Sequence, residues 1–161
     1  MNKSKQILAV AFASILAFGT VSCDKDDETT ENTNPAVQAV SGTYNGTIIE
    51  SIGGENRDTV NGTIVITPYG ENAVSVTLPS FGEGAMALME CVVENVTVTA
   101  NENAYTVSKE NFEKTLTKAD GSTIVYTGSI DGTVSNGCLT LSYDIKPGAM
   151  PMSIHFSFSQ Q

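Results

Sequence analysis

From Ser41 to the end of the chain, apolar and polar residues alternate in short runs rich in Val, Ile and Thr. The most regular run is the last one, which has on one side Met152, Ile154, Phe156 and Phe158. A period of two places successive side chains on opposite faces of a strand. These runs therefore predict strands with one buried and one solvated face. No stretch has a sustained helical period, and residues 108–114 are the best candidate for a short helical turn.

Residues that favour chain reversal separate these runs. The clearest reversals are at Gly70, Gly121, Gly137 and Gly148, which follow Tyr, Asp, Asn and Pro. Such turns are typical of hairpins between antiparallel strands. We therefore expect an all-β domain over residues 41–161, with about eight strands that are mostly hairpin-linked.

Two positions interrupt the alternation. The apolar face switches near Glu94, which predicts a β-bulge there. Gly46 lies inside a run that otherwise alternates, so it indicates a bend or a close strand crossing rather than a hairpin. A sandwich and a closed barrel both suit this many strands. An up-and-down barrel is favoured because closure removes both sheet edges.

The start of the chain has a different pattern. Lys3 and Lys5 precede an apolar run over residues 7–18, and small or polar residues lead to Ser22 and Cys23. The run is too short to span a membrane and is followed by charged residues. This order predicts a secretory signal peptide over residues 1–22.

The segment resembles the type II signal peptides of bacterial lipoproteins, with Ser22 and Cys23 at the cleavage site. The resemblance implies that Cys23 is acylated and becomes the mature N-terminus. The residues that follow, Lys25, Asp26 and Asp27, resemble the surface export signal of Bacteroidetes lipoproteins. By this resemblance, the protein is lipid-anchored in the outer membrane and faces the cell exterior.

Residues 23–40 are rich in Asp, Glu, Thr and Asn and lack a sustained apolar period. A segment of this composition cannot bury enough apolar surface to order itself. We therefore expect a disordered acidic tether that holds the domain off the membrane.

The chain is acidic, with 8 Lys and Arg against 18 Asp and Glu and a net charge of −10. Such a chain repels nucleic-acid phosphates, so we expect no nucleic-acid partner. The simplest interpretation of the acidity is solubility at a crowded surface.

The domain also resembles the calycin-like domains of Bacteroides lipoproteins over residues 41–160. The likeness rests on the motifs SGTYNGT (residues 41–47), VENVTV (residues 93–98) and KPGAMP (residues 146–151). Calycins are small up-and-down barrels, and lipocalins among them begin with Gly-x-Trp. Here Gly42, Thr43 and Tyr44 stand at the corresponding place. The resemblance implies a calycin-like β-barrel.

Residues with catalytic chemistry are sparse. The domain has one histidine, His155, on the polar face of the last run, and no nucleophile-elbow motif accompanies it. The pairs Glu90 with Glu94 and Glu110 with Glu113 are more simply explained as surface charges than as glycosidase carboxylates. We therefore expect a non-enzymatic protein without a metal or another cofactor.

Four methionines lie near two Gly-rich loops, residues 82–84 and 147–151. With two aromatic residues they form a candidate ligand-binding set at one end of the barrel: Phe81, Met86, Met89, Tyr143, Met150 and Met152. Methionine adapts its shape to apolar ligands. The competing interpretation is that these side chains fill the core of a small barrel.

Two cysteines remain besides Cys23. In an oxidising compartment, Cys91 and Cys138 could pair, but their spacing leaves both the disulfide and the free-thiol states open. Asp58, Thr59 and Val60 resemble the short acceptor motif of Bacteroidetes O-glycosylation.

Together these observations favour a surface lipoprotein whose barrel mouth binds a small apolar or amphipathic molecule. The alternative is an interaction protein with a side-chain-filled barrel that contacts an unknown protein through its loops.

Overall fold

The computed structural model describes residues 34–84 and 87–161. The predicted signal peptide and the residues Cys23, Lys25, Asp26, Asp27 and Met86 therefore lie outside the described part. The elements in these described residues are one helix and eight strands: α1 (Pro35–Val40), β1 (Gly42–Ile52), β2 (Glu55–Tyr69), β3 (Ala73–Leu78), β4 (Cys91–Ala100), β5 (Tyr105–Thr117), β6 (Thr123–Ser135), β7 (Cys138–Pro147) and β8 (Ile154–Gln160). No helix in the described part is both long and apolar enough to cross a membrane.

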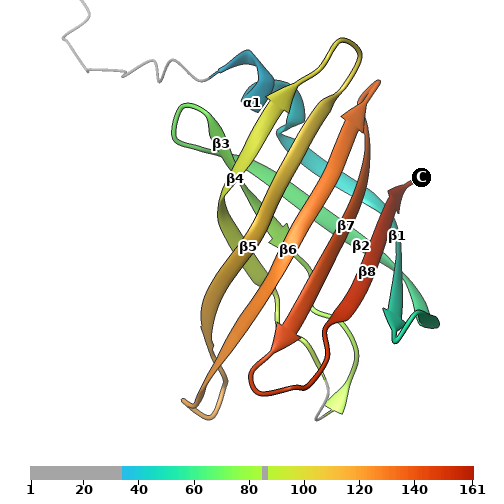
Figure 1. Ribbon diagram of the computed structural model, residues 1–161, viewed down its shortest axis with the longest axis vertical. Helices are drawn as coiled ribbons and strands as arrows, with labels where there is room; N and C mark the ends of the chain where they lie inside the picture. The colour runs from blue at the N-terminus through green and yellow to red at the C-terminus, as the bar shows by residue number, and fades with distance from the viewer. Residues whose placement is uncertain (1–33, 85–86) are drawn as a thin grey trace, which may run out of the picture. The chain divides into compact units, whose positions relative to one another are not determined.

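The strands form a closed antiparallel barrel in which each strand pairs with the next along the chain. Pairing of β1 with β8, from Gly46 opposite Gln160 to Ser51 opposite His155, closes the barrel. Figure 1 shows the strands wrapping in chain order around one axis. This architecture confirms the all-β, up-and-down barrel of eight strands that the alternation predicts.

Side chains fill the barrel interior. Apolar residues from all eight strands belong to one buried cluster. Phe156 is fully buried within it, stacks on Tyr143 with ring centroids 4.9 Å apart, and meets the edge of Phe81 at 5.1 Å. Aromatic pairs at these separations add to the stabilisation that burial itself provides.

Local details of the strands follow the sequence closely. The β6–β7 turn has positive φ at both Asn136 (52°) and Gly137 (77°), as expected for a two-residue hairpin turn. The predicted bulge is confirmed, because Val74 pairs with Val96 whereas Val76 pairs with Val93, and the register shifts between them.

Gly46 allows β1 and β8 to approach closely. A Cβ at this position would overlap the carbonyl oxygen of Ser159 and lie 2.8 Å from the Cα of Gln160. Because Gly46 is inside β1, the structure confirms a close strand crossing rather than a hairpin.

The end of the predicted tether requires a correction, because residues 34–40 are ordered. The Asn34 side chain accepts a hydrogen bond from the Ala36 N–H at 2.9 Å and caps α1, with Pro35 in its first turn. Val37 and Val40 are fully buried, and the Tyr44 hydroxyl donates to the Val40 carbonyl at 2.7 Å. Tertiary burial orders this short helix, which contacts β2, β4 and β5 at one end of the barrel.

The predicted helical turn at residues 108–114 is also corrected, since the segment lies within β5. The register of β5 against β6 shifts between Lys109 and Phe112. This irregularity buries both Val107 and Phe112, which are five positions apart. An odd spacing of buried residues breaks the period of two and imitates a helical pattern.

Candidate functional site

An apolar pocket lies at the barrel end opposite α1. Three connections gather there, namely the described residues 79–84 and 87–90 after β3, residues 118–122 after β5 and residues 148–153 after β7 (Figure 1). The pocket is open to solvent and has a volume of about 580 Å³. Its lining residues are Gly84, Ala87, Leu88, Met89, Lys118, Ala119, Ile124, Tyr126, Pro147 and Met150.

The connection after β3 is anchored to the core rather than free. Phe81 and Leu88 form an isolated bridge with two backbone hydrogen bonds of 3.1 and 2.8 Å, and both side chains are buried. The Met89 N–H donates to the Tyr126 hydroxyl at 2.9 Å. These contacts hold Leu88 and Met89 against the barrel end, where they form one side of the pocket.

The other two connections are also held by backbone hydrogen bonds. The Gly148 N–H donates to the Val125 carbonyl at 2.7 Å, and the Met150 N–H donates to the Pro147 carbonyl at 3.2 Å. In the β5–β6 turn, the Lys118 N–H donates to Ser122 and its carbonyl accepts from Gly121. The pocket therefore has fixed backbone on three sides.

The residues that line the pocket differ in how far they are buried. Leu88, Tyr126 and Pro147 are buried, Met89, Ile124 and Met150 are half-buried, and the remaining four residues are exposed. Lys118 alone among these described lining residues carries a charge. Pockets of a few hundred Å³ with mostly apolar walls and few polar groups suit small apolar or amphipathic molecules.

The structure places two residues of the predicted ligand set, Met89 and Met150, in the pocket. Phe81 and Tyr143 are instead buried in the core, where desolvation raises the pKa of the Tyr143 hydroxyl. Met152 is 48% exposed and does not line the pocket. The structure thus brings Met89 and Met150 together and places Phe81, Tyr143 and Met152 away from this pocket, while Met86 lies outside the described residues.

Sequence reasoning missed the contribution of the β5–β6 hairpin, which supplies Lys118, Ala119, Ile124 and Tyr126. In an up-and-down barrel, alternate connections lie at the same end. The turn at Gly121 therefore had to lie beside the two Gly-rich loops. Counting connections along the chain would have identified this third side of the pocket.

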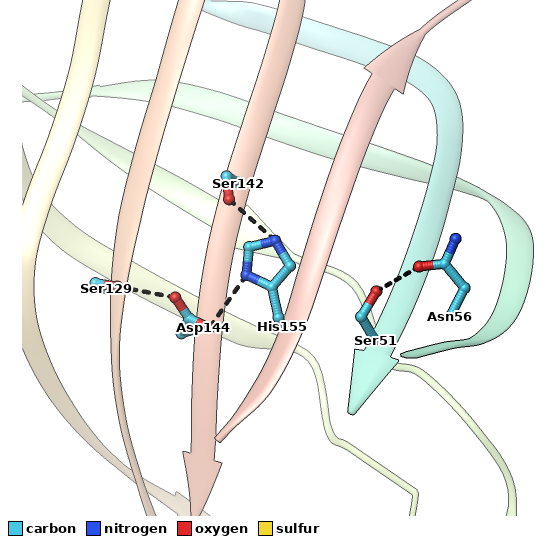
Figure 2. A network of polar contacts seen from close by, with 6 residues as sticks. All are labelled: Ser51, Asn56, Ser129, Ser142, Asp144 and His155. Atoms are coloured by element: carbon cyan, nitrogen blue, oxygen red, sulfur yellow. Dashed lines mark hydrogen bonds and ion pairs between the residues drawn. The ribbon is translucent and has the colours of Figure 1, made fainter. Parts of the chain in front are cut away.

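A cluster of polar side chains lies on the outward face of β7 and β8 (Figure 2). His155 Nδ1 is 3.2 Å from Asp144 Oδ1, and its Nε2 is 3.4 Å from the Ser142 hydroxyl. The serine, histidine and aspartate side chains are thus connected in the same order as in the catalytic triad of a hydrolase. However, β7 is paired on both edges, so its backbone N–H groups are engaged in the ladders and do not form an oxyanion hole.

Neither Ser142 nor His155 lines the pocket at the barrel end, and the side chains of His155 and Asp144 are 45% and 42% exposed. We interpret the cluster as a cross-strand polar network. The Ser129 hydroxyl extends it by donating to Asp144 at 3.4 Å. Such cross-strand pairs stabilise antiparallel sheets.

Cys91 and Cys138 are both free thiols. Cys91 is buried at the start of β4, and desolvation raises the pKa of its thiol to about 11, whereas Cys138 is exposed. Elevation of the thiol pKa reduces the thiolate fraction, which makes Cys91 a weak nucleophile. Within residues 34–84 and 87–161, no three His, Cys, Asp or Glu side chains are placed to hold a metal ion.

A protein-family model for the calycin-like beta-barrel domain matches residues 40–160. The chain belongs to this family. The match includes every strand of the barrel and the three connections that form the pocket. No curated protein sequence is significantly similar to the chain.

Among solved structures, the calycin-like barrel is similar to a protein of Bacteroides fragilis NCTC 9343 that is described provisionally as an outer membrane protein. The two chains are 27% identical, with a TM-score of 0.63. The similarity covers 79% of this chain and 53% of the Bacteroides protein. The chain therefore spans about half the length of that protein.

Proposed function

We propose that this calycin-like protein is a surface-exposed outer-membrane lipoprotein that binds a small apolar or amphipathic molecule without transforming it. The observation that carries the binding function is the apolar pocket of about 580 Å³ at one end of the barrel. Because side chains occupy the interior, the ligand lies in this pocket between the three connections rather than along the barrel axis.

Two observations support the location. The similar Bacteroides structure is described provisionally as an outer membrane protein. The N-terminal sequence combines an apolar run, Cys23 and the residues Lys25, Asp26 and Asp27, in the order expected of an exported lipoprotein. In this proposal, residues 23–33 form the tether and α1 begins the barrel domain.

A second candidate function is that of an interaction protein that contacts another protein through its loops. The filled interior favours this alternative, because a barrel without a central cavity leaves its surface as the place for recognition. Dye binding and loop substitutions at the pocket distinguish the two functions.

We expect phenylnaphthylamine, a neutral dye that fluoresces in apolar surroundings, to bind with about one molecule per chain. Met150→Gln should weaken this binding several-fold, because Met150 lines the pocket and is half-buried. Ala119→Phe should abolish it, because Ala119 lines the pocket and the larger ring would occupy part of its volume. Fluorescence titration of the chain from residue 24 onward, with melting temperatures of each variant, provides the measurement.

Met152→Gln is the matched control, since Met152 belongs to the same loop, is 48% exposed and lies outside the pocket. It should leave dye binding unchanged. A folded protein that binds no dye, or one whose dye affinity is equal in Ala119→Phe and the unaltered chain, would contradict ligand binding in this pocket. That result would favour the interaction protein.

Surface display is tested by replacing Lys25, Asp26 and Asp27 with alanine in the full chain. If these residues direct export, the variant should still incorporate palmitate but become resistant to protease added to intact cells. Alanine at Thr29, Thr30 and Glu31 gives a control of equal size in the same segment and should remain cleavable. Unchanged cleavage of the first variant would show that the three residues are not an export signal.

A further inference from the structure

Lys118 stands at the rim of the pocket, in the turn between β5 and β6. Its N–H donates to the Ser122 carbonyl at 2.8 Å, and its carbonyl accepts from the Gly121 N–H at 3.0 Å. The turn thus holds the Lys118 backbone in place beside the pocket. No carboxylate lies within ion-pair distance of its ammonium group among the described residues.

The acid nearest to Lys118 in the sequence is Asp120, whose hydrogen bonds go to Ser122. The Asp120 carboxylate accepts hydrogen bonds from the Ser122 N–H at 2.9 Å and from its hydroxyl at 2.6 Å. These bonds lower the pKa of Asp120, and the positive charge of Lys118 adds a smaller effect in the same direction, although the two side chains form no direct ion pair. Among the described residues no carboxylate is in direct contact with the Lys118 ammonium, so its N–H groups remain available to a ligand.

Other cations in the barrel are engaged or placed elsewhere. Lys114 pairs with Glu94 at 3.2 Å, and Lys109 donates to the backbone carbonyls of Glu94 and Asn95. Lys146 faces a groove on the outside of β6 and β7. The chain as a whole carries a net charge of −10, which repels anions. Lys118, in contrast, places a positive charge at the rim of the apolar pocket.

We propose that the ligand of this pocket is an amphipathic anion, with an apolar body against Met89, Ile124 and Met150 and an anionic head group at Lys118. This inference rests on the proposed binding function and adds the ligand class. An ammonium group donates to carboxylate, sulfate or phosphate oxygens alike, so a simple carboxylate serves as the probe.

Three ten-carbon probes that share one alkyl chain separate the head group from the apolar body: decanoic acid, decanol and decylamine. Each competes with phenylnaphthylamine on the chain from residue 24 onward, at neutral pH and below its micelle concentration. We expect decanoate to bind about two- to fivefold more tightly than decanol, which is the scale of one solvent-exposed ion pair. Decylamine should bind most weakly. Added salt should weaken decanoate binding and leave decanol binding unchanged.

Lys118→Met should make the affinities of decanoate and decanol equal, and Lys118→Glu should reverse the preference toward decylamine. Lys146→Met is the matched control, because it makes the same change in net charge outside the pocket and should retain the decanoate preference. Equal binding of decanoate and decanol to the unaltered chain would overturn the anionic ligand class while the binding function stands. Displacement of the dye by none of the probes would overturn both.

Discussion

We expect Phe156→Ala to lower the free energy of unfolding by about 3–5 kcal/mol, the range for deleting a fully buried aromatic side chain. Phe156 has no exposed surface and contacts the rings of both Tyr143 and Phe81. Removing its ring leaves a cavity in the middle of the barrel that eight hydrogen-bonded strands cannot collapse to fill. Urea unfolding, followed by circular dichroism, provides the measurement.

Two further substitutions on β8 test whether lost packing causes the expected decrease in the free energy of unfolding. Phe156→Leu retains part of the volume and should cost less than Phe156→Ala. Ser157→Ala changes the next residue, whose side chain faces outward, and should lie within about 0.5 kcal/mol of the unaltered chain. A cost below about 1 kcal/mol for Phe156→Ala would mean that the interior is loosely filled or hollow, contrary to the packing described here.

The barrel could be predicted from sequence because strand burial is a property of alternate residues. In β8, Ile154, Phe156 and Phe158 are all buried and the residues between them are not. Turn residues such as Asn136 and Gly137 then set the hairpins, since few other residues adopt positive φ without strain. When each strand pairs with the next one along the chain, only the pairing of β1 with β8 is still needed to close the barrel.

The helix at Pro35–Val40 escaped the same reasoning because six residues are too few to display a period. Its stability comes from contacts with β2, β4 and β5 that are remote in sequence. One local signal was available, since Asn34 followed by Pro35 combines a preferred N-cap with a preferred first helical residue.

Only part of the pocket could be predicted from the sequence. Alternation indicates which face a residue occupies, but it does not say how deep along the barrel that residue lies. Tyr143 and Met150 illustrate the difference: the sequence predicts both at the mouth, yet Tyr143 is buried in the core and Met150 lies in the loop. Lys118 was overlooked because a charged residue in a turn has no distinctive pattern.

We expect Cys23→Ala to abolish incorporation of labelled palmitate into the protein and to prevent removal of residues 1–22. The proposed acylation and cleavage both require the Cys23 thiol, so the effect should be complete rather than graded. Each buried methylene contributes roughly 0.8 kcal/mol to membrane binding, and more than one acyl chain is needed for a stable anchor. Labelling in cells and the intact mass of the purified chain provide the measurements.

Cys138→Ala is the matched control, because Cys138 is an exposed thiol on the barrel that could also accept an acyl group. This variant should keep both the label and the cleavage. The uncleaved Cys23→Ala chain retains its apolar run and can remain in a membrane fraction, so the label and the mass decide the outcome rather than fractionation. Palmitate that persists in Cys23→Ala but disappears in Cys138→Ala would move the acylation site to the start of β7, and the N-terminal residues would then act only in secretion.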